Sequence, residues 1–340
     1  MFSKLITKKT DLKNAGSDEF RENRRRQRDL LSQEEIRTLC VIDNWRSMLG
    51  VLGTLGVIMG AILLATFFWH PLVVIPAIIV IASRQQALFV LVHDSVHYRL
   101  FSVRWLNDLV GRLLAMPGGI SMCTYRVIHR LHHNHLFDER DPDVPLIAGY
   151  PRGRRYLLVK LAKDLIGLNA WKTFKYFFGA PVINDDAVVA NRPLDDTAPR
   201  LRQAARRDRW WVVVWHVVLF LAAVIGGWWV EYLVLWLLPL VTVMQVLLRL
   251  RAVLEHGAVT DQLSVLRSAR TNLGSRWLMW FLFPHCVNYH IEHHLFPAIP
   301  FYNLPKCHEL LSQKGVMLDA EVRSTSESLE MIMADRVAIN

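Results

Sequence analysis

The segment from Ser47 to Trp69 contains no charged residue and is long enough, as a helix, to cross a bilayer core of ~30 Å. Three further apolar stretches follow it, at Leu72–Val92, Trp210–Val230 and Tyr232 to about Leu250. Tryptophan and tyrosine cluster at their ends, where amphipathic rings favour the membrane interface. The chain is 52% hydrophobic and yet carries a net charge of +10, a combination typical of membrane proteins. We therefore expect an all-α integral membrane protein with four transmembrane helices.

Lysine and arginine are concentrated outside these four stretches. The links Trp69–Leu72 and Trp228–Tyr232 contain neither residue, whereas the N-terminal segment, the loop 98–209 and the tail after Leu250 carry nearly all of them. The positive-inside rule then places both links outside or in the lumen, and both termini and the long loop in the cytosol. Membrane orientation thus explains the basic charge, and we expect no nucleic-acid partner.

This pattern predicts a chain of five segments. They are a basic cytosolic N-terminal segment (1–46), transmembrane helices one and two (47–97), a cytosolic region with an interfacial helix (98–209), transmembrane helices three and four (210–252) and a cytosolic C-terminal region (253–340). The two larger cytosolic regions would form a helical cap.

Eight of the 14 histidines fall in three short motifs, two in the first and three in each of the others. The motifs are His93-Asp-Ser-Val-His97 at the end of the second stretch, His129-Arg-Leu-His132-His133 in the long loop, and His290-Ile-Glu-His293-His294 in the C-terminal region. All three lie on the predicted cytosolic side.

The spacing within each motif indicates metal binding. On a helix, residues three or four apart share a face, so each motif directs its imidazoles broadly to one side. Eight imidazoles are too many for one ion and suit two. Imidazole binds iron, zinc, copper and nickel alike, so the ligand type does not identify the metal. The four cysteines form no CxxC pair, which excludes a cysteine-ligated zinc site.

With these motifs, the chain resembles the membrane-bound fatty acid desaturase and hydroxylase superfamily of non-haem diiron enzymes. The likeness includes the phrase NYHIEHHLFPAIPFYNLP from Asn288 to Pro305 and the acidic turn Asp141-Pro142-Asp143. It extends over roughly Trp45 to Leu310, most of the chain.

The resemblance implies two iron ions bound by the motif histidines, with O2 as co-substrate. The ligands would be His93, His97, His129, His132, His133, His290, His293 and His294, with His256 as a candidate ninth. Candidates to accept the free N–H of a ligand imidazole and fix its orientation are Asp94, Asp141, Asp143 and Glu292. The other five histidines are expected to be structural or to lie around the ligands.

The implied activity is O2-dependent desaturation of a fatty-acyl chain. The same site would serve a hydroxylase, a carotenoid ketolase or a fatty acid decarboxylase that forms a terminal alkene, and a histidine-rich metal transporter or sensor is the alternative from another class. The sequence shows no dinucleotide fingerprint and no cysteine set for an iron–sulfur cluster. We therefore expect a separate electron donor: ferredoxin, rubredoxin or cytochrome b5.

Several residues near the predicted site invite specific interpretations. Arg84, inside the second stretch, is expected to bond to polar groups of a neighbouring helix, with a lipid headgroup as the alternative. Arg249 and Arg251 are expected to anchor at lipid phosphates. Candidate walls of an apolar substrate tunnel, each also explicable as plain packing, are Trp105, Leu106, Leu113, Leu114, Trp277 and Phe281.

Overall fold

The computed structural model describes residues 29–138, 141–179 and 199–335. Most of the basic segment predicted over 1–46 lies outside these residues. The described chain is helical almost throughout, and its strands are two pieces of three residues each. The predicted all-α class is therefore confirmed.

Four helices are long and apolar enough to cross a membrane. They are α3 (Asn44–Phe67), α4 (Pro71–Val96), α12 (Pro199–Gly226) and a final span, Trp229–His256, that runs through α13 (Trp229–Glu231), η2 (Tyr232–Leu237), α14 (Leu238–Val241) and α15 (Val243–His256). The third span differs from its predicted bounds, because its helix begins within the predicted loop region. It ends before Gly227, whose positive φ of 76° reverses the chain.

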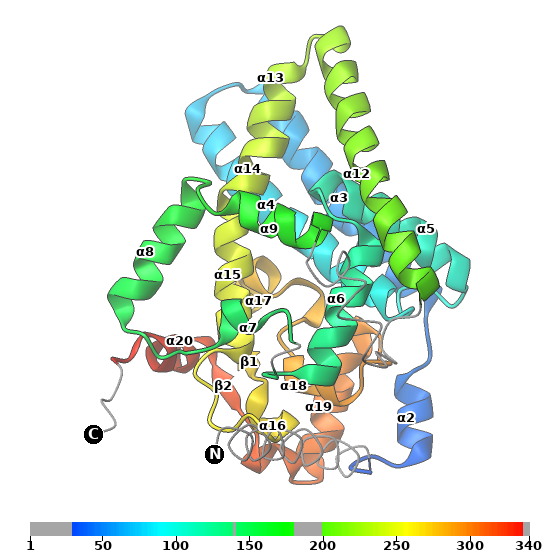
Figure 1. The fold of residues 1–340 in the computed structure, drawn as a ribbon, viewed down its shortest axis with the longest axis vertical. Coiled ribbons are helices and arrows are strands. Elements are labelled where there is room, and N and C mark those ends of the chain that lie inside the picture. The colour runs from blue at the N-terminus through cyan, green and yellow to red at the C-terminus, as the bar shows by residue number, and fades with distance from the viewer. Residues whose placement is uncertain (1–28, 139–140, 180–198, 336–340) are drawn as a thin grey trace, which may run out of the picture.

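The outward faces of these spans are apolar and exposed. Leu63 and Phe67 of α3 expose 61% and 81% of their surfaces, and Ile225 of α12 exposes 87%. An apolar surface this extensive on a soluble protein would be unstable in water, whereas a lipid environment suits it. The upper part of Figure 1 consists of these spans, and the remaining helices form a cap at one end.

The central helix of the molecule is α4. Every residue from 81 to 96 is buried, so the half of α4 that approaches the cap is covered on all sides. That half contains a run of polar residues whose side chains donate hydrogen bonds to main-chain carbonyls of neighbouring elements. Ser83 donates to Phe281 O at 2.7 Å, Gln85 to Trp236 O at 2.9 Å and Gln86 to Leu282 O at 2.6 Å.

Arg84 belongs to the same polar run. Its guanidinium donates to the carbonyl of Trp280 and lies 3.8 Å from the centre of the Trp280 ring. The expected bond to a neighbouring element is thus present. The contacts of Ser83, Arg84 and Gln86 fix α17 (Arg276–Leu282), the short helix that leads into the third histidine motif, against α4.

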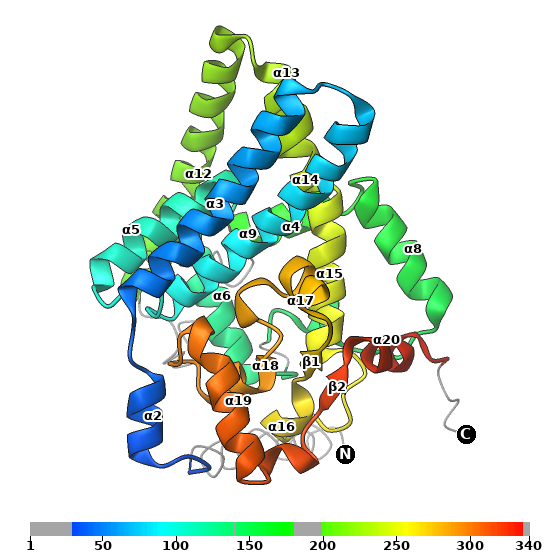
Figure 2. The same cartoon turned by 180° about the vertical axis from the view of Figure 1, so that it is seen from behind.

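The first part of the cap follows α4. It contains α5 (Arg104–Ala115), η1 (Met116–Gly118), α6 (Met122–His135), α7 (Val144–Ile147), α8 (Arg154–Leu165) and α9 (Ala170–Gly179). The second part follows α15 and contains α16 (Val265–Ser268), β1 (Thr271–Leu273), α17, η3 (Pro284–Cys286), α18 (His290–Leu295), η4 (Phe301–Asn303), α19 (Leu304–Gln313), η5 (Val316–Asp319), β2 (Val322–Ser324) and α20 (Thr325–Met333). Figure 2 shows α19 between α2 (Gln33–Leu39) and β2.

A small parallel sheet holds the third histidine motif. β1 pairs with β2 in the register Thr271↔Val322, Asn272↔Arg323 and Leu273↔Ser324, and Thr271 also bridges to Tyr289. Tyr289 directly precedes α18, a helix of only six residues. A helix this short gains little stability from its own hydrogen bonds, so its position depends on such tertiary contacts.

Candidate metal centre

The three histidine motifs occupy three helices that converge beneath the spans. His93 is in the last turn of α4 and His97 is the residue that caps it. The second motif occupies the last turns of α6, whose N-terminus is capped by Ser121 Oγ, which accepts from Thr124 N at 3.1 Å. The third motif forms most of α18. His256 is the last residue of α15.

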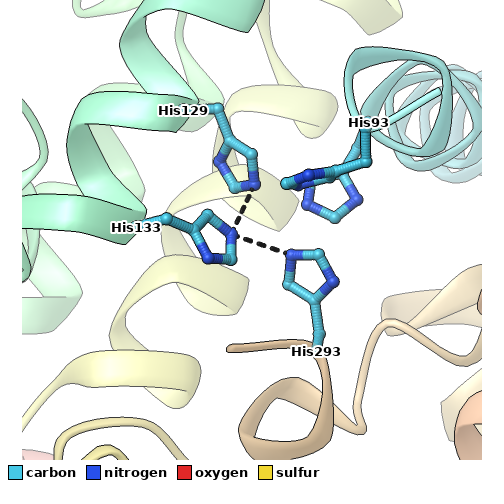
Figure 3. Close-up of side chains that lie close together, drawn as sticks. His93, His129, His133 and His293 are labelled. Carbon is cyan, nitrogen blue, oxygen red and sulfur yellow. Dashed lines mark hydrogen bonds between the residues drawn. The ribbon is translucent and has the colours of Figure 1, made fainter. Parts of the chain in front are cut away.

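One set of imidazoles, which we call the five-histidine group, draws on all three motifs. Each member offers one nitrogen, and these nitrogens all lie within 4.8 Å of one another. His133 Nε2 lies 2.9 Å from both His129 Nε2 and His293 Nε2. Figure 3 shows these rings and His93 turned toward a common centre. The members are His93, His97, His129, His133 and His293.

A second set, the four-histidine group, lies beside the first. His256 Nε2 lies 2.8 Å from His290 Nε2 and 3.2 Å from His132 Nε2, and His294 Nε2 lies 3.1 Å from His290 Nε2. The members are His132, His256, His290 and His294, all buried. Every histidine predicted as a ligand, including His256, thus belongs to one of the two groups.

The nitrogen separations fit one ion in each group. Two ligands at about 2.1 Å from an ion and about 90° apart are themselves about 3.0 Å apart, and opposite ligands are about 4.2 Å apart. Adjacent nitrogens in this structure are separated by 2.8–3.2 Å. A centre of nine imidazoles with no cysteine suits iron, zinc, copper or nickel.

Two imidazoles are oriented by hydrogen bonds from the nitrogen that points away from the group. His132 Nδ1 donates to Asp141 Oδ1 at 3.0 Å, and His256 Nδ1 donates to the carbonyl of Ser268 at 2.9 Å. In the neutral imidazole, each bond places the proton on Nδ1 and leaves the Nε2 lone pair available to an ion. Asp141 is itself held by Asp143 N and Phe137 N at 2.9 and 3.0 Å.

Burial controls the charge of the imidazoles. It lowers the pKa of His129, His133, His290 and His294 well below the usual value, and the neighbouring imidazoles lower it further. Neutral imidazole is the form that binds metal. Burial also opposes the charged form of His132, but Asp141 and Asp143 outweigh it and raise its pKa to about 9. The four-histidine group therefore carries compensating negative charge beside it.

The carboxylates predicted to support the ligands differ in what they contact. Asp141 and Asp143 approach His132 Nδ1, at 3.0 and 3.4 Å. Asp94 Oδ1 lies 3.7 Å from His93 Nδ1, and its other oxygen accepts from Phe301 N at 2.9 Å. Asp94 thus also connects the first motif to the segment after the third.

Glu292 was predicted to accept a hydrogen bond from a ligand imidazole, and this prediction was wrong. Its carboxylate accepts from Thr271 Oγ1 at 2.6 Å and from His308 Nδ1, and neither residue belongs to a histidine group. Glu292 is two positions after His290, and residues two apart on a helix do not share a face. The face that carries the imidazoles is therefore not the face that carries Glu292.

The remaining five histidines, all of them in the described part of the chain, lie outside both groups. His285 Nε2 pairs with Thr54 Oγ1 at 2.9 Å, and His216 bonds to Tyr232 and to the carbonyl of Met116. The other three are His70, His135 and His308.

A cavity of about 470 Å³ reaches both groups. Its inner end is formed by His93 and His129 of one group and by His132, His256 and His290 of the other. The sides come from α6, α7, α8, α9 and α15. Tyr125 lies four residues before His129 on α6, so helical spacing from the second motif indicates it as a lining residue.

The cavity corrects two interpretations of the sequence. The proposed tunnel walls do not line it, and Trp105 and Trp277 are 66% and 82% exposed on the outer surface. Arg249 and Arg251 do line it, and they form ion pairs inside the protein rather than with lipid phosphates. Arg249 pairs with Asp164, and Arg251 Nε lies 3.1 Å from Glu255 Oε1.

Known proteins with related sequences are named as desaturases and as a ketolase. The chain is 25% identical to dihydrorhizobitoxine desaturase of Bradyrhizobium elkanii over 74% of this chain and 70% of that protein. It is 24% identical to an sn-1 acyl-lipid omega-3 desaturase (ferredoxin) of Nostoc over 66% and 63%. It is also 27% identical to zeaxanthin 4-ketolase of Chlamydomonas reinhardtii over 66% and 41%.

The family model for fatty acid desaturases matches residues 67–326, which include all three histidine motifs and His256. This match covers most of the chain, and it agrees with the four apolar helices and the paired histidine groups. The protein is an oxidoreductase of the membrane, and the chain belongs to the fatty acid desaturase family.

Proposed function

We propose that this protein is an O2-dependent fatty-acyl desaturase that introduces a double bond into a lipid acyl chain at a histidine-ligated diiron centre. The observation that supports this most strongly is the pair of histidine groups at the inner end of one cavity. Structural or transport roles for histidine do not require nine imidazoles, eight of them buried, in two compact groups. Family membership favours an enzyme over the transporter or sensor considered from the sequence.

In this proposal each group binds one iron ion. The first ion is bound by His93, His97, His129, His133 and His293, and the second by His132, His256, His290 and His294. Asp141 and Asp143 orient the ring of His132, and the Ser268 carbonyl orients that of His256. The carboxylate of Asp94 lies beside His93 Nδ1 and attracts it.

Bound iron would supply an O2-derived oxidant that is able to break an unactivated C–H bond. The protein's own part is to hold the acyl chain in the cavity with two adjacent carbons beside His93 and His129. The buried imidazoles and the covered half of α4 exclude bulk water from this end.

The reaction also needs electrons from outside the substrate. Removing two hydrogens from a substrate while reducing O2 to two waters consumes two further electrons and two protons. Within these 340 residues we find no fingerprint for a nucleotide cofactor. We therefore propose a separate donor: ferredoxin, rubredoxin or cytochrome b5. The name of the Nostoc relative includes ferredoxin.

We further propose that both termini and the metal centre face the cytosol. The support is the distribution of lysine and arginine, which are missing from both short links between spans and abundant in the cap. A cytosolic cap would also place the centre where soluble electron donors can dock.

The second candidate function is a different oxidation of the substrate by the same centre. Hydroxylation, ketolation and oxidative decarboxylation to a terminal alkene need the same ligands, and the position of the substrate decides among them. The specific observation in favour of this alternative is the relative named as a zeaxanthin 4-ketolase.

Two measurements test the proposal. Purified protein should contain about two iron ions per chain, and cells that express it should convert fed fatty acids into products two hydrogens lighter by mass spectrometry. His97→Ala should abolish the product. Oxygenated products, or terminal alkenes one carbon shorter than the fed acid, would favour the second candidate. Zinc in place of iron in protein loaded under iron-replete conditions would contradict the diiron assignment.

A further inference from the structure

The cavity is lined by more positively charged side chains than negatively charged ones. Four cations and three carboxylates line it: Lys160, Lys172, Arg249, Arg251, Asp143, Asp164 and Glu255. Arg249 pairs with Asp164, and Arg251 pairs with Glu255. Asp143 faces His132 and accepts a hydrogen bond from the Tyr176 hydroxyl. Each carboxylate therefore already has a partner within the protein.

Lys160 and Lys172 are the cations that remain. Neither forms an ion pair with an acidic side chain in the described part of the chain, and each ammonium instead lies near an aromatic ring. Lys160 Nζ is 5.4 Å from the centre of the Tyr156 ring, and Lys172 Nζ is 5.8 Å from that of Trp171. The cavity wall thus carries two ammonium groups without a balancing anion.

These two lysines lie at the outer part of the cavity. Lys172 is exposed and Lys160 half-buried, whereas the histidines at the inner end are buried. The segment between the two lysines carries exposed apolar side chains, with Ile166 at 68% and Leu168 and Trp171 each at 58%. Apolar side chains beside basic ones are typical of a surface in contact with the headgroup region of a membrane.

We propose that this cavity selects substrates with an anionic headgroup, and that Lys160 and Lys172 bind that headgroup at the opening while the apolar chain extends to the histidine groups. The proposal rests on the proposed function and narrows its substrate to amphiphiles with a carboxylate or a phosphate. Lysine binds either anion as a point charge. Neutral substrates such as sterols, alcohols or carotenoids leave both ammonium groups unpaired.

A direct binding experiment tests the inference on the full chain in maltoside micelles. Palmitate, hexadecyl phosphate and hexadecanol compete with a fluorescent fatty acid for the purified protein, which compares headgroups on equal chains. We expect one or both anions to bind about tenfold more tightly than the alcohol, an advantage that falls as salt is added. Preference for palmitate indicates a free fatty acid as the source, and preference for the phosphate indicates a lipid headgroup.

The variant that carries the test is Lys160→Gln with Lys172→Gln, which should remove most of the advantage of the anions. The matched control is Lys163→Gln with Lys175→Gln, because these exposed lysines lie on the same two helices and do not line the cavity. The control should keep the wild-type preference. The variant Lys160→Arg with Lys172→Arg should also keep it, since the positive charge is retained.

Two results would overturn the inference. Hexadecanol could bind the wild type as tightly as both anions do, or the glutamine variant could keep the full preference. Iron content is measured on the same samples, which separates this inference from the proposed function. Protein that selects anions but binds no iron contradicts the diiron proposal alone.

Discussion

His256 Nε2 lies 2.8 Å from His290 Nε2, although 34 residues separate the two in the chain. The contact joins the end of the last span to the third histidine motif. Without His256, the four-histidine group would hold three imidazoles, the number typical of sites that leave a coordination position open. His256 therefore completes the second group.

The first prediction concerns this residue. His256→Ala should remove a ligand of the second ion, so iron content should fall toward about one ion per chain and product formation should fall about 100-fold or more. Metal analysis and product quantification on the same preparation check this. The control is His70→Asn, because His70 is exposed at the start of α4 and asparagine can also cap a helix. Undiminished iron in His256→Ala would exclude His256 as a ligand.

Asp141 provides the second prediction. Asp141→Asn removes the charge that orients His132 and should lower the affinity of the second site for metal by about 10–100-fold. Titration with a competing chelator measures the effect.

The same substitution could act through the loop that Asp141 caps, because its oxygens accept from two main-chain N–H groups. Thermal unfolding of the metal-free protein distinguishes the two roles. If the metal-free variant is as stable as the wild type and its metal affinity is reduced, Asp141 acts on the site. Unchanged metal affinity would refute that role.

Arg84 carries the third prediction. Arg84→Leu leaves the carbonyl of Trp280 without this donor and should cost about 1–3 kcal/mol, lowering the thermal midpoint in detergent. Because α17 leads into the third motif, metal content should fall as well. Arg84→Lys retains a donor and should lose less. A variant Arg84→Leu with wild-type stability would show that the bond contributes nothing.

The fourth prediction tests the proposed membrane orientation. His70→Cys, between the first two spans, should react with an impermeant maleimide on intact cells, and Gln313→Cys on α19 should react only after permeabilisation. The opposite pattern would invert the topology.

The native cysteines allow this experiment with two background changes. Burial raises the pKa of Cys123 and of Cys286 to about 11, and it also raises the pKa of Cys307. Since the thiolate is the reactive form, these thiols should label slowly at neutral pH and faster as the pH rises. Cys40 and Cys286 are both half-buried, so Cys40→Ala with Cys286→Ala removes the two cysteines that are nearest to solvent.

Local patterns were enough to predict the class of fold and the histidines that make up the two groups. A run of apolar residues such as Ser47–Trp69 specifies a span regardless of its neighbours, because the bilayer sets the required length. The spacing of His129, His132 and His133 likewise depends only on the helix period. The ends of the spans were predicted less accurately than their existence. The helix α12 begins at Pro199, in a segment whose charges indicated a loop.

Tertiary structure decided how those histidines are divided between the two groups. His129 and His133 are four residues apart and join the five-histidine group, whereas His132 points to the four-histidine group. One helix can serve two sites because its period of 3.6 residues turns neighbouring side chains to different sides. The sequence by itself determined which residues bear imidazole at helical spacing. Only the packing of α4, α6, α15 and α18 decided which imidazoles meet, because nitrogen atoms distant in the chain become neighbours only when their helices pack together.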